Sequence, residues 1–539
     1  MSKVLRSALV VLAAVGAAAA AGALQAALRR QAVDPQGAAA VQRPPRIHPD
    51  YSGITIPPNI APLNFCVDEP GRAYHVTVSA ARGEPIRVTA DEPKIVIPPK
   101  KWRVLLNANQ GDQLRFDVCA QGADGSWQQY EPITNTIARE PIDSYLVYRL
   151  MNVIYNYYQR MKLCEHNIES AEESVLLDSR SFGDGCMNCH MFLANGVEKV
   201  AIQIRQGSAP YGSGMLLIQD GVITKVDART AANPRVAAFA SWHPSGRALV
   251  FSTNKVRQFF HSARKEVREG IDLISDLSVY VLDTHSVLNP PSISRPDQLE
   301  TWPTWSADGR YLYYCNAPLL WTESDVPPPP HHLDLRYDLM RIAFDVESRR
   351  WGDPETVLSA GQARQSITLP RSSPDGKFLL FCMSKYGGFP ALQPDADLYM
   401  MDLASRRYWR LECNSDEAES WHAWSSNSRW IVFSSKRVDK IFMKAYLCYV
   451  DEDGHAQKPF VLPQKDPAFY DSFIRVYNVP EFAREPMPVR GEEIAAVIRS
   501  APWARVEMVT TAATPASASP EPGGAEEGSG AEPWEPFGR

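Results

Sequence analysis

The clearest pattern along the chain is a polar turn followed by a short apolar strand, and it recurs four times in the second half. The four segments read SWHPSGRALVFS at 241–252, TWSADGRYLYYC at 304–315, RSSPDGKFLLFC at 371–382 and AWSSNSRWIVFS at 423–434. In each, Asp-Gly or its equivalent supplies the tight turn, the basic residue stays in water, and the apolar run forms a buried strand.

These repeated units predict a β-propeller. A second strand ending in Asp follows each segment, and an earlier, weaker unit at 215–220 makes five recognisable units. A period of roughly fifty to sixty-five residues with several strands per unit is typical of propeller blades, whose sheets bury both faces only when they stack radially. We therefore expect a propeller of five or six blades over 199–485, with Trp242, Trp305 and Trp424 packed between neighbouring blades rather than at a ligand site.

The region before the propeller divides in two. Over 51–140, short alternating runs such as HVTV at 75–78 are separated by Gly, Pro and Asp, which predicts a small β-sandwich. Over 141–198 we expect a short helical connector, because apolar and tyrosine residues between Ile142 and Leu163 recur at helical spacing. The expected fold class is thus mainly β.

The two ends of the chain differ in composition from the rest. Lys3 and Arg6 precede an apolar run of about twenty residues, so 1–30 is expected to be a cleaved signal peptide or an uncleaved membrane anchor. Either one predicts a periplasmic protein, or one anchored in the inner membrane and facing the periplasm. Residues 31–50 are typical of a linker, 486–508 of a C-terminal extension, and 509–539 of a disordered tail.

Composition narrows the functional classes. A hydrophobic fraction of 45%, a charged fraction of 22% and 43 prolines fit a soluble, turn-rich protein. The net charge of −6 comes with scattered Lys and Arg, so we expect no nucleic-acid partner. Cys66 and Cys119 lie near the two ends of the expected β-sandwich, where they form either a disulfide or two separate buried thiols.

The strongest chemical signal is CMNCH at 186–190, a Cys-x-x-Cys-His motif in an exported chain. Roughly 0.003 such matches are expected by chance from this composition. Two thiols at this spacing can each add to one vinyl group of a single haem, and the adjoining imidazole then reaches the iron. We therefore predict one haem c, attached through Cys186 and Cys189, with His190 as an axial ligand of the iron.

Other readings of the motif remain open. Zinc is an alternative, because Cys164 and His166 lie about twenty residues upstream and complete a four-ligand set with the two motif cysteines. A thiol-disulfide redox pair is less favoured, since no βαβ pattern surrounds the motif, and a structural disulfide would leave His190 without a role. If haem is bound, His166 and His243 are the candidates for the sixth ligand.

Several segments together resemble a known family. They are IAPLNF at 60–65, CMNCH at 186–190, WHPSG at 242–246, FHS at 260–262, the run 421–437, PFVLPQKDP at 459–467 and YNVPEF at 477–482. This combination is similar to TolB-like (WD40-like) β-propeller proteins that carry a c-type haem motif, as found in Bacteroidetes and other bacteria. The resemblance implies the architecture and a haem site, at Cys186, Cys189 and His190, and implies no substrate.

Two functions follow as expectations. The first is an exported cytochrome-like protein, in which a covalently bound monohaem electron-transfer module is fused to a propeller that binds a periplasmic or envelope protein, including a redox partner. The alternative is a non-enzymatic TolB-like binding propeller with a structural haem or zinc site. No nucleophile elbow, His-Glu-x-x-His or paired-carboxylate motif favours a hydrolase. We therefore leave enzyme activity open and favour a protein without it.

Overall fold

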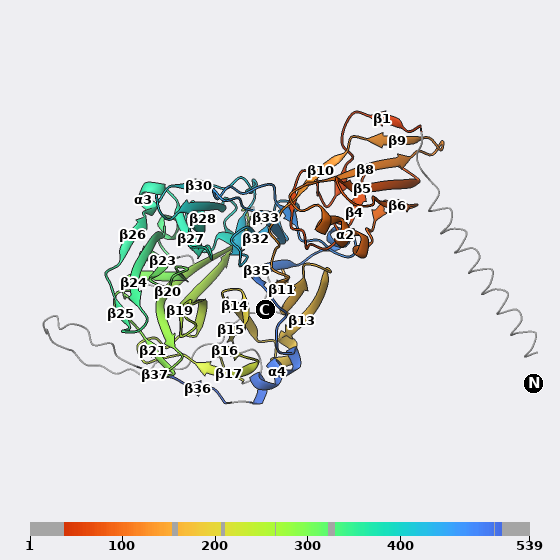
Figure 1. Ribbon diagram of the computed structural model, residues 1–539. Coiled ribbons are helices and arrows are strands. Elements are labelled where there is room, and N and C mark those ends of the chain that lie inside the picture. Colours follow the sequence, from red (N-terminus) through yellow and green to blue (C-terminus); the bar gives the residue numbers. More distant parts are fainter. Residues whose placement is uncertain are drawn as a thin grey trace, which may run out of the picture. The chain divides into compact units, whose positions relative to one another are not determined.

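The structure is a computed structural model that divides into two compact units (Figure 1). It describes residues 37–153, 160–205, 211–264, 266–321, 329–500 and 502–508. The first unit comprises Met1–Pro141 and Pro463–Ser472, and the second comprises Ile142–Leu462 and Phe473–Arg539. The predicted signal or anchor at 1–30 and the tail at 509–539 lie outside the described residues. Among the described residues, no helix has the length and apolar character needed to cross a bilayer.

The first unit is built from two sheets and one helix. The larger sheet has seven strands: β1 (Ala39–Val41), β3 (Thr55–Ile56), β5 (Ala73–Ala80), β6 (Ile86–Ala90), β8 (Gln113–Gln121), β9 (Trp127–Tyr130) and β10 (Ile133–Ile137). The smaller sheet has three: β2 (Ile47–His48), β4 (Phe65–Val67) and β7 (Lys94–Ile95). The two sheets agree with the β-sandwich prediction. Strands β1 and β2, however, lie inside the segment predicted to be a linker.

The helix of this unit was not predicted. It is α2 (Pro99–Ala108), which begins at a proline, the residue whose missing N–H costs least in the first helical turn. Trp102 is buried and donates its indole N–H to the Ile60 carbonyl at 2.9 Å, which fixes α2 against the sheets. The short 3-10 turn η5 (Phe469–Ser472) also belongs to this unit.

The second unit contains six antiparallel sheets in its described residues. The first three are β35 (Val476–Ala483) with β11 (Tyr145–Met151), β12 (Lys162–Asn167) and β13 (Glu172–Asp178); β14 (Cys186–Leu193) with β15 (Gly196–Arg205), β16 (Gly214–Gln219) and β17 (Val222–Asp227); and β18 (Ala237–Trp242) with β19 (Ala248–Phe260), β20 (Arg268–Val281) and β21 (Ser286–Leu288).

The other three sheets follow in chain order. They are β22 (Gln298–Trp305) with β23 (Tyr311–Pro318), β24 (Asp338–Asp345), β25 (Arg350–Trp351) and β26 (Glu355–Leu358); β27 (Ser366–Ser372) with β28 (Phe378–Ser384), β29 (Asp397–Asp402) and β30 (Tyr408–Arg410); and β31 (Glu419–Trp424) with β32 (Trp430–Ser435), β33 (Lys444–Tyr449) and β34 (Phe460–Val461). Short helical turns join them: η2 (Ser179–Phe182), η3 (His332–Asp334), α3 (Ala360–Ala363) and η4 (Pro390–Leu392).

These sheets form a β-propeller. Their first strands contact one another in a closed ring, in the order β14, β18, β22, β27, β31, β35 and back to β14. The ring closes because β35, from the end of the chain, pairs antiparallel with β11, from the beginning of the unit. A ring leaves no open sheet face, since each sheet covers its neighbours. The predicted propeller is therefore present.

The four repeated turn-strand segments form the first two strands of four of these sheets, as predicted. Their tryptophans pack between sheets and are fixed by hydrogen bonds. Trp242 donates to the Met191 carbonyl at 3.2 Å, and Trp305 donates to the Ser241 carbonyl at 3.2 Å. Trp424 makes the corresponding bond to the fifth sheet at 3.1 Å. Each indole therefore joins one inner strand to the preceding one.

The helical connector predicted for 141–198 is wrong over its described part. Residues 145–151 form β11, and the segment also supplies β12, β13 and β14, so the propeller begins well before residue 199. The reason is that β11 is buried on both faces, and a strand of this kind has no polar alternation to distinguish it from a buried helix. Residues 154–159, which carried part of the helical pattern, lie outside the described residues.

The predicted C-terminal extension adds to the propeller edge. It contains α4 (Gly491–Ser500), whose buried Ile494 and Ile498 face β13 and β17. Beyond it, β36 (Ala504–Arg505) and β37 (Glu507–Met508) pair in parallel with the outer strands β17 and β21.

Candidate functional site

The Cys-x-x-Cys-His motif lies on β14, the innermost strand of its sheet. Met187 pairs with Ile204 of β15, and after a bulge at Asn188 and Cys189, His190 pairs with Ile202. An extra residue in a strand shifts the alternation of side chains by one position. The bulge therefore brings Cys186 and Cys189, three residues apart, to the same face of β14.

Cys189 is buried, and Cys186 is half-buried. Burial raises the pKa of the Cys186 thiol and of the Cys189 thiol above the usual value, while the nearby Arg149 guanidinium acts in the opposite direction on both. Gly185, just before the motif, fits only as glycine, because a Cβ there would lie 2.8 Å from the Arg205 carbonyl oxygen.

Arg149 lies directly behind the motif. It projects from β11, is 5% exposed, and donates to the Met187 carbonyl at 2.9 Å and to the Asn188 side-chain oxygen at 3.2 Å. Its other partner is the side-chain oxygen of Asn478 on β35. Within the described part of the chain, no carboxylate forms an ion pair with this guanidinium, so its charge is buried among neutral acceptors.

His190 is fully buried between β14 and β11. Its Nε2 lies 3.1 Å from the Val147 carbonyl oxygen, and its Nδ1 is buried without a hydrogen-bond partner. Burial, together with the charge of Arg149, lowers the pKa of this imidazole to about 3, so the ring is neutral at physiological pH. A neutral imidazole with one nitrogen fixed by a carbonyl and the other unbound is the usual state of a metal-ligating histidine.

His422 provides an internal comparison. It lies within a bulge on β31, whereas His190 follows the bulge on β14, and its Nε2 lies 3.2 Å from the Leu380 carbonyl oxygen of the preceding sheet. Its Nδ1, however, faces the Cys382 Sγ at 3.6 Å. The propeller therefore uses the same inter-sheet bond twice, and only at His190 is the second ring nitrogen without a partner.

The inner strands also bring aromatic and charged groups to the propeller axis. Phe239 stacks on Trp302 with 3.5 Å between ring centroids, and Trp421 lies edge-on to Trp302 at 5.6 Å. Nearer the motif, Arg371 on β27 and Glu481 on β35 form an ion pair at 3.4 Å. Burial raises the pKa of the Glu481 carboxyl to about 7, and Arg371 opposes that shift.

Sequence reasoning missed the charged groups that surround the motif. Arg149 had a recognisable signal, since it is the one charged residue in the apolar run YLVYRLM at 145–151. Arg371 had none, because basic residues occur in many of the turns of the repeats.

The other predicted ligands are not gathered at the motif. His243 directs both ring nitrogens elsewhere, to Ser245 Oγ at 2.7 Å and to the Gly309 carbonyl at 3.0 Å, so ligation of an iron by His243 would require it to leave one of these partners. His166 lies buried on β12, in register with Leu146.

The four-residue zinc set is not assembled either. Cys164 and His166 belong to the first propeller sheet, whereas the motif cysteines belong to the second. In the part of the chain that the structure describes, no three His, Cys, Asp or Glu side chains converge on a common metal position. In the first unit, Cys66 on β4 and Cys119 on β8 are thiols on different sheets, not a disulfide.

Comparison with known proteins gives distant structural similarities and no sequence family. No protein-family model and no curated protein matches the sequence. Among solved structures, the chain is similar to the Dos1 propeller (TM-score 0.32, 10% identity, 53% of this chain and 64% of that chain). It is also similar to an oligogalacturonate lyase from Vibrio parahaemolyticus (TM-score 0.32, 10% identity, 72% and 100%) and to hydrazine synthase from Kuenenia stuttgartiensis (TM-score 0.28, 12% identity, 51% and 65%). Just under two thirds of the Dos1 chain is covered.

Proposed function

We propose that this protein is an exported monohaem propeller that transfers electrons to or from a periplasmic or envelope partner. One haem c is held by Cys186 and Cys189, with His190 as an axial ligand of the iron. The N-terminal segment either directs export or also anchors the protein in the inner membrane. His166 and His243 remain the candidates for the sixth ligand.

The observation that carries the proposal is the buried charge of Arg149. A guanidinium at 5% exposure is strongly destabilising unless an anion compensates it, and its observed partners are all neutral oxygens. Haem carries two propionate carboxylates, and Arg149 is the residue that would hold one of them if haem were bound at the motif.

The same charge argues against zinc. The guanidinium of Arg149 lies close to both motif cysteines, and that of Arg205 acts on Cys186 as well. A divalent cation among two thiols and these guanidinium groups is opposed by like charge, whereas an anionic macrocycle is favoured. The donor set and its charge therefore fit haem better than zinc.

Haem, when bound, supplies one-electron transfer at a fixed position in the protein. The chain's own contributions are two thiols for covalent attachment, a neutral imidazole and the buried guanidinium of Arg149. The bond from His190 Nε2 to the Val147 carbonyl occupies the nitrogen that haem c uses. The proposal therefore requires that His190 leave Val147 when haem is attached.

The test is covalent haem retention by the full chain, expressed in a bacterial host with the cytochrome c maturation machinery. We expect one haem per chain in a pyridine haemochrome spectrum of denatured protein. The double variant Cys186→Ala, Cys189→Ala loses it. The control Cys315→Ala, Cys382→Ala, which removes two buried propeller thiols away from the motif, keeps it.

A matched histidine pair tests the axial ligand. His190→Gln changes the Soret spectrum of the attached haem, while His422→Gln, which removes a similar inter-sheet bond elsewhere in the propeller, does not. Absence of covalent haem in the wild-type chain refutes the proposal. Equal spectral changes in both histidine variants refute the assignment of His190.

A partner-binding assay separates this function from the alternative of a binding propeller with a structural haem or zinc. If the Cys186→Ala variant binds its envelope partner unchanged and the wild-type haem exchanges no electrons with that partner, the alternative holds.

A further inference from the structure

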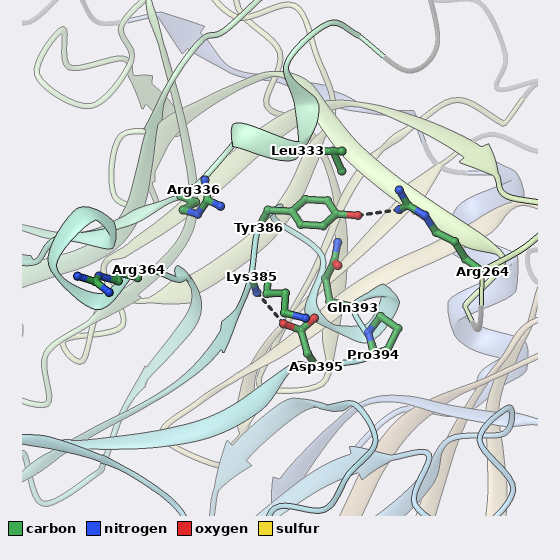
Figure 2. Close-up of a pocket in the computed structure, with 9 residues that line it drawn as sticks. All are labelled: Arg264, Leu333, Arg336, Arg364, Lys385, Tyr386, Gln393, Pro394 and Asp395. Carbon is green, nitrogen blue, oxygen red and sulfur yellow. Dashed lines mark hydrogen bonds between the residues drawn. The ribbon is translucent and has the colours of Figure 1, made fainter.

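A second chemically distinctive place is a pocket of about 530 Å³ on the propeller, shown in Figure 2. It is formed by the connections that follow β19, β23, β26 and β28, so three neighbouring sheets contribute to it. Four cationic side chains line it, Arg264, Arg336, Arg364 and Lys385, with Asp395 as the one carboxylate. The residues of the haem motif are not among its lining.

The positive charge of this pocket is largely uncompensated. The Asp395 carboxylate accepts a hydrogen bond from the backbone N–H of Lys385 at 2.9 Å. Arg336 donates to the neutral carbonyl of Asp334 at 3.2 Å. Considering only the described residues, Arg336, Arg364 and Lys385 form no ion pair with a carboxylate. These three side chains therefore offer unpaired positive charge to an anion that enters the pocket.

Arg264 is held in a fixed orientation at one side of the pocket. Its Nη1 donates to Glu269 Oε2 at 2.9 Å and to the Tyr386 hydroxyl at 2.8 Å, the bond drawn in Figure 2. Glu269 is buried, and its carboxylate also forms a hydrogen bond with His261 Nε2 at 2.5 Å. These contacts hold the Glu269 carboxylate, and with it the Arg264 guanidinium, in place. A guanidinium has five N–H donors, and a pre-oriented one loses little entropy when it binds an oxyanion.

We propose that this pocket binds a small molecule carrying two or more carboxylate or phosphate groups. The volume falls within the range of about 300–1,000 Å³ that is usual for small-molecule sites. Tyr386 and Leu333 give the pocket an apolar side, against which the carbon skeleton of such a ligand packs. The inference is independent of haem, because no residue of the motif contributes to it.

The test is isothermal titration of the full chain, with and without attached haem, at an ionic strength of about 10 mM. Citrate is the carboxylate probe, pyrophosphate the phosphate probe, and acetate the control of single charge. We expect saturable binding of citrate, pyrophosphate or both at one site per chain, and none of acetate. Citrate alone identifies a polycarboxylate site, and pyrophosphate alone identifies a phosphate site.

Variants locate the site. The double variant Arg364→Gln, Lys385→Gln weakens binding about tenfold, since it removes two solvent-exposed contacts between a cation and the anion. Lys377→Gln is the control, because this exposed lysine lies at the opposite end of β28 from Lys385. Thermal melting confirms that the variants fold. Lack of binding by both probes, or equal affinity of the double variant and the control, overturns the inference, whatever the outcome for haem.

Discussion

The buried imidazole of His422 leads to a quantitative prediction about acid stability. The side chain is 3% exposed, and its Nε2 bonds the Leu380 carbonyl. Burial, followed by the charge of Arg371, lowers the pKa of His422 from its ordinary value of 6.5 to about 3. The folded protein therefore keeps this ring neutral at pH values where the unfolded chain protonates it.

The sign and size of the effect follow from proton linkage. Between pH 6.5 and 3 the unfolded state binds one more proton at this position, so the free energy of unfolding falls as the pH falls. Each pH unit below 6.5 removes about 1.4 kcal/mol, which gives a loss of about 2 kcal/mol at pH 5 relative to pH 8. Above pH 6.5 this residue contributes no pH dependence.

The perturbation is His422→Gln, which keeps a hydrogen-bonding side chain but cannot titrate. Urea unfolding at pH 8 and at pH 5 measures the free energy of unfolding of wild type and variant. We expect the wild type to lose about 2 kcal/mol more than the variant over this interval. His455→Gln is the control, since the hydrogen bond that His455 donates to the Glu412 carboxylate raises the pKa of this exposed histidine. Equal acid losses in wild type and His422→Gln would show that the ring is not buried neutral.

Three further predictions concern other buried or crowded positions. Burial raises the pKa of the Glu300 carboxyl to about 8, so the folded protein keeps it protonated where the unfolded chain releases the proton. The free energy of unfolding of the wild type should therefore fall by about 3 kcal/mol as the pH rises from 4.5 to 7. Urea unfolding at the two pH values should show that Glu300→Gln removes this fall. Gly185→Ala should lower the unfolding free energy by about 1–3 kcal/mol through the clash with the Arg205 carbonyl; an unchanged thermal midpoint contradicts this. Trp305→Phe should cost about 1 kcal/mol by removing the hydrogen bond to Ser241, and a double-mutant comparison with Trp242→Phe checks that the inter-sheet bonds act independently.

Local signals explain why the propeller was predictable. Each repeated segment contains its own turn and its own apolar strand, and both are properties of about twelve neighbouring residues. The tryptophans were assigned to inter-sheet packing for the same reason, and their indole bonds confirm it. The first propeller sheet had no such signal, because its inner strand comes from the other end of the chain. Asn478 lies 329 residues after its partner Arg149, a separation that no local pattern encodes.

The same distinction between local and long-range information applies to the candidate site. By itself, the sequence determined which groups are available at the motif: two thiols and an imidazole in a fixed order. The chemical type and the spacing of these residues are covalent properties of the chain, so they can be identified without knowledge of the fold. Only the tertiary structure decided the surroundings of these groups, including the bulge on β14, the carbonyl of Val147 and the buried charge of Arg149. Those features depend on strands that meet only when the ring closes, and they set the charge, burial and hydrogen bonding on which any redox function depends.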